Sequence, residues 1–459
     1  MSQIELIEIK NHPVFRKKKI EFKNFDHDKN IFTVIIGQNG CGKSELLRVI
    51  ADSVNSHIIY NSNIGSIKVD TAGDITFKNG EIPQKVLASS FSLNDKFPIL
   101  TRRNKLYHED YEYLGLRSTS NNAFVGKYKK EFLKRLVNVL SEERRLDAFT
   151  QVLAELNIPL QFKFSFKYGR GLKTILDSSD EANTYHDFDS KVDNFISNKL
   201  KKSRLDYEKL YERLKSSHFK TEIYSFIKSK SKRFSSLEYR VDLSNPIYND
   251  KFMQDSAILI NLIESGVIQI NDFSFTTVND YSFSVASSGQ HHLFTEMLNI
   301  ASSIVDNSLL LIDEPEISLH PNWQIRYIEL LEIITSSFSK CHTIICTHSH
   351  FLLSSINEDV CSIMHTKRTK DGDVEITECN QNTFGWSPEQ VLYNVFGLST
   401  TRNHYFERDL RLIVNILSRV NKNKEEIHEP LERIKRFNIT DDDPLKLLIN
   451  RADEFIKRM

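Results

Sequence analysis

Eight residues near the N-terminus, Gly37-Gln38-Asn39-Gly40-Cys41-Gly42-Lys43-Ser44, have the types and spacing of a phosphate-binding loop. Glycines let backbone amides turn toward one anion, and a lysine can neutralise β- and γ-phosphate oxygens. A serine hydroxyl at the end of the loop suits Mg²⁺. An apolar run precedes the loop and helix-like spacing follows it. This order predicts an ATP and Mg²⁺ site made of Gly37, Asn39, Gly40, Cys41, Gly42, Lys43 and Ser44. Cys41 is interpreted as a small loop residue without a catalytic role.

Two adjacent carboxylates, Asp313 and Glu314, follow the aliphatic run 309–312. A fully apolar run is typical of a central parallel strand that is buried on both faces. We expect Asp313 to hold the magnesium and Glu314 to polarise an attacking water. The alternative, a solvated acidic pair at a strand end, is disfavoured by the phosphate-binding loop upstream.

His348 follows the apolar segment 343–346 and lies 34 residues (348 − 314) beyond Glu314. A lone histidine is more often structural than catalytic. Its position one strand after the two carboxylates nevertheless predicts a contact with the γ-phosphate. Weaker candidates are His291, His292, His320 and His350.

Ser287-Ser288-Gly289-Gln290 opens a segment with helical spacing that ends just before the acidic strand. The start of a helix is an anion-binding end. Lys43 already serves one γ-phosphate, so a second phosphate-binding element in the same chain is surplus. We therefore expect that the nucleotide of a partner chain is bound by Ser288, Gly289 and Gln290, which predicts dimerisation.

The bulk composition sets wider limits. The chain has 459 residues, 40% of them apolar, which is enough for two or three units with a large core. The net charge is zero, so the whole molecule does not attract nucleic acid. We expect no membrane span and no secretion signal. Five cysteines without metal-ligand spacing indicate reduced thiols and a cytoplasmic protein.

The pattern along the chain predicts four parts. Residues 1–100 combine strands with one helix, residues 101–255 form an inserted helical arm, 256–380 return to strands, and 381–459 are helical. Hairpins are expected over 66–77 and 361–378.

A basic stretch lies within the insertion. Between 199 and 233 lysines and arginines outnumber acidic residues. We expect this basic arm to offer a surface for DNA or RNA, and a solvated helix face remains the alternative.

Taken together, the four motifs resemble the ATP-binding cassette (ABC) ATPase superfamily, in its SMC- and RecF-like cytosolic branch, over about 1–100 and 270–365. The resemblance implies an α/β head with a mixed, mainly parallel P-loop core sheet and an antiparallel β subdomain. The inserted helical arm and C-terminal helical tail complete the expected architecture. It also implies that Ser288, Gly289 and Gln290 contact the partner's γ-phosphate, in a homodimer or higher homo-oligomer joined through the heads.

One feature departs from that family. A glutamine that ligates Mg²⁺ usually follows the second core strand, but residues 88–98 contain none. Ser92, Asn94 or Asp95 could substitute. This departure predicts slow hydrolysis and nucleotide-gated switching.

A further resemblance is carried by three sequence segments, at 90–98, 113–118 and 384–388. They look similar to segments of bacterial defence ATPases, the PtuA subunits of Septu and retron-linked systems. That resemblance implies a separate HNH nuclease subunit of the PtuB type and a role against phage. The different class that stays open is a DNA repair or recombination ATPase of RecF or SMC type. A transporter motor is disfavoured by the long polar insertion.

Overall fold

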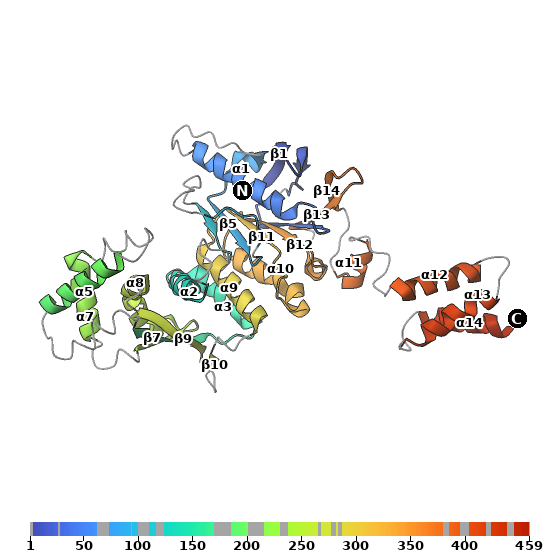
Figure 1. Cartoon of the computed structure of the whole chain (residues 1–459). Coiled ribbons are helices and arrows are strands. Elements are labelled where there is room, and N and C mark those ends of the chain that lie inside the picture. Colours follow the sequence, from blue (N-terminus) through green and yellow to red (C-terminus); the bar gives the residue numbers. More distant parts are fainter. Residues whose placement is uncertain are drawn as a thin grey trace. The chain divides into compact units, whose positions relative to one another are not determined.

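The computed structural model describes residues 3–25, 28–61, 73–92, 94–99, 110–115, 124–168, 185–200, 215–229, 237–264, 268–276, 281–282, 287–357, 359–379, 385–394, 404–418, 424–437 and 445–458. The chain divides into two compact units, Met1–Gly385 and Trp386–Met459. Figure 1 labels many of their elements, with numbers that follow the chain. The first unit holds all the described strands, and the described elements of the second are helices.

A seven-stranded sheet forms the centre of the first unit, with the order β14-β13-β3-β12-β11-β5-β6. Its strands are β3 (Ile31–Gly37), β5 (Lys85–Ser90), β6 (Tyr111–Tyr113), β11 (Ser308–Asp313), β12 (His342–Thr347), β13 (Cys361–Arg368) and β14 (Val374–Cys379). All neighbours are parallel except β13 and β14, which form the expected hairpin. Every residue of β3, β11 and β12 is buried. Continuous apolar runs are typical of strands that are covered on both faces of the sheet. The predicted α/β fold with a mostly parallel core sheet is confirmed.

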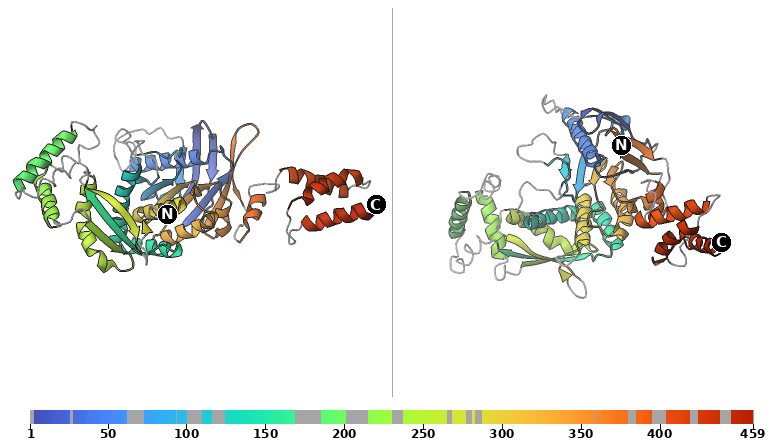
Figure 2. Two further views of the ribbon diagram at one scale, coloured as in Figure 1. Left: turned by 60° about the horizontal axis from the view of Figure 1, so that its bottom comes forward. Right: turned by 45° about the vertical axis from the view of Figure 1, so that its right-hand side comes forward.

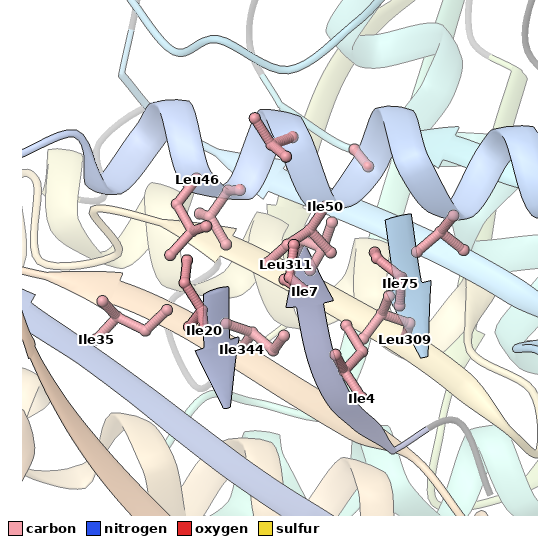
Figure 3. Packing of buried hydrophobic residues seen from close by; sticks show 14 of the residues in the cluster. Ile4, Ile7, Ile20, Ile35, Leu46, Ile50, Ile75, Leu309, Leu311 and Ile344 are labelled. Carbon is pink, nitrogen blue, oxygen red and sulfur yellow. The ribbon is translucent and has the colours of Figure 1, made fainter. Parts of the chain in front are cut away.

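A three-stranded antiparallel sheet shares a hydrophobic core with helix α1 (Lys43–Asn61) and the central sheet. Its strands are β1 (Ile4–His12), β2 (Arg16–Glu21) and β4 (Gly73–Phe77), in the order β2-β1-β4. Figure 3 shows Ile7 of β1, Ile50 of α1 and Leu311 of β11 meeting in this core. Burying each such side chain stabilises the fold by about 1.5–3 kcal/mol. The core therefore fixes α1, and with it the phosphate-binding loop, above the ends of the central strands.

The hairpin expected over 66–77 lies partly outside the described residues. Its second half is β4, which pairs with β1 in an antiparallel manner and places Ile75 opposite Ile7. The expected antiparallel β subdomain is therefore present, with β1 as its central strand.

Four helices pack together beside the core sheet (Figure 1). They are α2 (Phe124–Leu140), α3 (Glu143–Glu155), α9 (Ser288–Ser303) and α10 (Pro321–Ser336). Phe294 of α9 lies at their contact, with its ring centroid 5.8 Å from that of Phe132 and 5.7 Å from that of Phe149. The first two helices of the insertion thus pack against the helix that starts at Ser288.

The insertion 101–255 contains strands as well as helices, which the expected helical arm did not include. An antiparallel sheet has the order β10-β9-β7-β8. Two of its strands, β7 (Gln161–Tyr168) and β8 (Leu237–Asp242), lie in the insertion. The other two, β9 (Ile268–Phe275) and β10 (Tyr281–Ser282), lie in the part 256–380, where strands were expected. Phe162, Phe164 and Phe166 alternate with polar residues and are all buried, a period of two that is typical of a strand. Helix α8 (Asp250–Glu264) packs on this sheet.

The basic stretch 199–233 lies mostly outside the described residues. Its described part belongs mainly to α7 (Ser217–Ser229), which packs against α5 (Tyr185–Leu200) and lies beside it in Figure 2. The Lys220 side chain is 5% exposed, and its Nζ lies 2.7 Å from Asp189 Oδ1 and 2.6 Å from Asp193 Oδ1. This lysine therefore ties two helices together and does not face solvent.

The second unit is a small helical assembly. Its helices are α11 (Pro388–Asn394), α12 (His404–Ser418), α13 (Lys424–Lys435) and α14 (Leu445–Arg458). Ile413, Ile427 and Ala452 bring the last three into one core. Arg433 donates to both oxygens of the buried Asp409, at 2.7 and 2.9 Å, and these hydrogen bonds lower the pKa of Asp409. The tail thus has a core and an ion pair of its own.

Two expectations from composition can be compared with the structure. Across the part of the chain that the structure describes, no helix is both long enough and apolar enough to cross a membrane. The cysteines are unpaired thiols, and Cys41, Cys341, Cys346 and Cys361 are buried.

Candidate functional site

Three neighbouring parallel strands end at one edge of the core sheet and bring the predicted residues together. Strand β3 leads into Gly37, β11 ends at Asp313, and β12 ends at Thr347, one residue before His348. Asp313 pairs in register with Cys346. Ligands of open α/β sheets bind outside the carboxyl ends of the strands, so this edge is the expected place for a site.

The phosphate-binding loop has the backbone that its glycines predict. Gly40 and Gly42 have φ angles of 77° and 82°, a left-handed region that glycine adopts without strain. A Cβ atom on Gly42 would also lie 2.9 Å from Val14 Cγ1. Helix α1 begins at Lys43, so its positive end faces the loop. Asn39 is exposed, whereas Cys41 is buried, as expected for a packing residue.

The Lys43 ammonium group is held inside the loop. Its Nζ donates to the carbonyl oxygens of Gly37 at 2.8 Å and Gln38 at 3.2 Å, and lies 2.9 Å from His348 Nε2. Burial lowers the pKa of Lys43, although nearby carboxylates, including Glu314, oppose the shift. Lys43 and His348, far apart in sequence, are thus in contact.

Asp313 is a buried carboxylate at the end of β11. Its side chain is 2% exposed. Burial raises its pKa to about 7; Glu314, Asp95 and Glu316 add to the shift, and a hydrogen bond with Ser44 opposes it. Among the described residues, no partner for its Oδ1 atom was found. A buried carboxylate oxygen of this kind beside a serine hydroxyl fits a Mg²⁺ ion, which prefers oxygen ligands.

Glu314 adopts a left-handed backbone with φ of 51°, which is uncommon for a residue other than glycine. Its N–H donates to the Cys346 carbonyl at 2.8 Å, which anchors this turn to the end of β12. Its Oε1 lies 3.5 Å from His348 Nε2, and both side chains are 29% exposed. The hydrogen bond with His348 lowers the pKa of Glu314, although partial burial acts in the other direction. Glu314 therefore stays ionised at neutral pH and can accept a proton.

Glu316 was not among the residues predicted from the sequence. Its Oε1 accepts the backbone N–H of His348 at 2.6 Å, and its Oε2 accepts the Thr347 hydroxyl at 2.8 Å. This carboxylate fixes the loop that carries His348. A third acid two residues after Glu314 was the only signal in the sequence.

The loop after Glu314 is also tied to the His348 loop through α10. Ser349 donates its hydroxyl to Gln324 Oε1 at 2.6 Å, and Gln324 Nε2 donates to the Leu319 carbonyl at 2.9 Å. His320, one of the weaker candidates, caps α10 by accepting the Asn322 N–H at 3.3 Å.

Ser287-Ser288-Gly289-Gln290 lies at the start of α9, as predicted. Ser287 and Gln290 form a reciprocal capping box, with the Gln290 N–H 3.2 Å from Ser287 Oγ and the Ser287 N–H 3.0 Å from Gln290 Oε1. A Cβ on Gly289 would lie 2.6 Å from the Ser318 carbonyl oxygen, so this glycine permits close packing on the loop after Glu314. Within the described part of the chain, no hydrogen bond or ion pair was found that joins Gln290 to Lys43, Asp313 or His348.

A mostly parallel sheet, a phosphate-binding loop before α1 and a buried aspartate at the end of a neighbouring strand define the class of P-loop ATPases. The family model described as the AAA ATPase domain matches residues 3–353, more than half of the chain. The chain belongs to this family, and its enzymatic class is that of an ATPase.

Two curated relatives are similar to this chain. The chain is 22% identical over 470 residues to the retron Vc95 probable ATPase of Vibrio cholerae, covering 93% of this chain and 86% of the relative. It is also 33% identical over 100 residues to the Septu protein PtuA of Bacillus thuringiensis, covering 21% of this chain and 24% of the relative. The resemblance to these two groups of ATPases is confirmed.

Two solved structures are similar at low identity. The SMC head domain from Thermotoga maritima matches with a TM-score of 0.32 and 12% identity, covering 83% of this chain and 100% of the other. The ATP-binding cassette of an ABC transporter matches with a TM-score of 0.31 and 13% identity, covering 86% and 96%.

Proposed function

We propose that this ATPase binds Mg²⁺-ATP at the edge of the core sheet and hydrolyses it slowly, as a nucleotide-dependent switch. The observation that carries the proposal is Asp313, a buried carboxylate joined to Ser44 of the phosphate-binding loop, with an oxygen for which no protein partner was found. Mg²⁺ bound there neutralises phosphate charge.

Each residue at the edge has a role in this proposal. The loop amides from Gly37 to Lys43 bind phosphate, and Lys43 exchanges its contacts with two loop carbonyls for contacts with phosphate oxygens. Ser44 and Asp313 hold the magnesium. Glu314, ionised and half-buried, accepts a proton from the attacking water.

His348 is proposed to contact the γ-phosphate. Its ring lies between Lys43 and Glu314, 2.9 Å from Lys43 Nζ and 3.5 Å from Glu314 Oε1. His348 can therefore contact both the bound γ-phosphate and the general base, Glu314.

The second part of the proposal is a head-to-head dimer. Ser288, Gly289 and Gln290 stand at a helix start. Among the described residues, no hydrogen bond or ion pair was found that joins Gln290 to the site of its own chain. A helix start attracts anions, so this element can bind the nucleotide held by a second copy. The close packing of Gly289 on the loop after Glu314 would transmit that contact to Glu314.

The third part concerns biological context. The similarity to a retron ATPase and to Septu PtuA supports a role in anti-phage defence, with a separate HNH nuclease as partner. In this scheme the nucleotide state of the heads controls the nuclease.

Binding of a fluorescent ADP analogue to wild type and to Lys43→Ala tests the proposed nucleotide site. We expect wild type to bind and the variant to lose at least about tenfold in affinity, because a charge-assisted contact contributes about 1.5–3 kcal/mol. Lys18→Ala, a half-buried lysine of β2 paired with Asp373, serves as the control. Equal affinity in all three proteins would refute the proposed site.

A further inference from the structure

His292 and Glu296 form a buried polar pair inside helix α9. They lie one turn apart on the same face of the helix, and their side chains are 3% and 1% exposed. His292 Nε2 lies 3.5 Å from Glu296 Oε2. Neither residue has a role in the proposed ATP site, so the reason for a buried carboxylate and imidazole in this helix has to be sought elsewhere.

The pair ties α9 to the end of strand β5. Ser89 Oγ donates to Glu296 Oε1 at 2.9 Å, and Ser89 is itself 2% exposed. The ring of Phe91, the first residue after β5, stacks on the His292 ring with the centroids 3.5 Å apart. Ser89 pairs in register with Ile312, the last residue but one of β11. The two contacts therefore join α9 to the strand next to β11, close to where β11 ends.

The apolar contacts of α9 fix its position less sharply than these polar ones. Phe294 meets the rings of Phe132 and Phe149 from the insertion. Apolar contacts are non-directional, whereas a hydrogen bond depends on both distance and angle. The hydrogen bond from Ser89 to Glu296 therefore restricts how α9 can slide or turn against β5.

Stability alone does not account for the pair. Burying a carboxylate is costly, and apolar residues of similar volume in place of a buried ion pair often leave a protein equally or more stable. Among the described residues, no hydrogen-bond partner was found for Glu296 Oε2 or for the two ring nitrogens of His292. The cost of burial is thus only partly offset. Buried polar groups of this kind can specify one arrangement of the elements that they join.

We propose that Glu296 and His292 are positioning residues for ATP hydrolysis. They hold α9 where its first residues can reach the nucleotide of a second copy. This inference rests on the proposed head-to-head dimer. It gives the pair a role in turnover and in dimerisation, and none in the binding of nucleotide to their own chain.

The test replaces the whole pair by apolar side chains of similar size, His292→Phe together with Glu296→Met. We expect the urea midpoint of this double variant to stay at or above the wild-type value. ATP turnover should fall at least about tenfold, because a displacement of about 1 Å in a reacting geometry can cost about 10²-fold in rate. ADP affinity should not change, since the phosphate-binding loop is untouched. In the Glu314→Gln background, the same two changes should weaken ATP-driven dimerisation.

Ile300→Val is the matched control, because Ile300 is a buried apolar residue of the same helix. It should lower the urea midpoint and leave turnover like that of wild type. Unchanged turnover in the double variant would overturn the role of the pair, and so would an equally large loss of turnover in Ile300→Val. A Glu314→Gln chain that does not dimerise with ATP would instead overturn the proposed dimer.

If the double variant does not fold, Ser89→Ala removes only the hydroxyl that donates to Glu296. We expect a several-fold loss of turnover in Ser89→Ala with wild-type ADP affinity. Turnover equal to that of wild type would overturn the positioning role.

Discussion

Lys43 Nζ lies 2.9 Å from His348 Nε2, and the same ring nitrogen lies 3.5 Å from Glu314 Oε1. One imidazole thus joins the lysine of the phosphate-binding loop to the carboxylate that follows β11. This arrangement gives His348 two possible effects on the reaction. It can contact the γ-phosphate and it can orient Glu314.

The first prediction concerns His348. His348→Ala should lower ATP turnover about 10²-fold or more, the range expected when a positioned proton-handling group is lost. ADP has no γ-phosphate, so ADP affinity should stay within a few-fold of wild type. Steady-state hydrolysis and ADP titration measure the two effects. A matched loss of ADP affinity would instead assign His348 to general nucleotide binding.

The second prediction concerns the proposed general base. Glu314→Gln keeps the size of the side chain but cannot accept a proton, so turnover should fall about 10²–10⁴-fold. ATP should then remain bound and the dimer should accumulate, as seen by light scattering. Glu329→Gln, which alters a carboxylate on α10 that is 51% exposed, should behave like wild type. Wild-type turnover in Glu314→Gln would remove Glu314 from its assigned role.

The third prediction concerns Glu316 as a positioning residue. Glu316→Ala leaves the His348 N–H and the Thr347 hydroxyl without their acceptor, which should lower the free energy of unfolding by about 1–3 kcal/mol. Turnover should also fall while ADP affinity is kept, because the His348 loop shifts. Glu316→Gln retains one acceptor oxygen and should recover part of both losses. Reduced stability with normal turnover would restrict Glu316 to a structural role.

The motifs were predictable from sequence because each depends on local backbone needs. The loop 37–44 requires glycines at positive φ, and the run 309–312 requires burial on both faces. Glu316 was harder to assign, because its partners come from a distant part of the chain: Thr347 at the end of β12 and His348 directly after it. The strands β7 and β8 in the insertion were missed although Phe162, Phe164 and Phe166 alternate with polar residues, since helix-like spacing dominates the surrounding segment.

The fourth prediction concerns pH. The folded pKa of Asp313 is about 7 against an ordinary value of 3.8, so the folded chain binds this proton more tightly than the unfolded chain does. The contribution of Asp313 to the free energy of unfolding therefore falls as pH rises between these two values. Its upper limit is about 4 kcal/mol, from about 1.4 kcal/mol for each pH unit.

Urea unfolding at several pH values checks this slope in the absence of metal. Asp313→Asn should flatten the profile. Asp74→Asn, which alters a carboxylate of β4 that is 57% exposed, should keep the wild-type slope. Mg²⁺ with ADP should also flatten it in wild type, because the metal replaces the proton. Parallel profiles for the two variants would show that Asp313 does not titrate as described.

The last prediction concerns the shared nucleotide site. Ser288 begins α9, directly before Gly289, whose missing Cβ allows contact with the Ser318 carbonyl. Ser288→Arg places a long side chain at this helix start, where a partner nucleotide would have to approach. In the Glu314→Gln background, ATP should drive dimerisation, and adding Ser288→Arg should abolish it while ATP still binds to the single chain. Ser336→Arg, at the exposed end of α10, controls for a new arginine and should leave dimerisation intact. If the Ser288→Arg chain dimerises with ATP as fully as the Ser336→Arg chain, the start of α9 does not lie at the dimer interface.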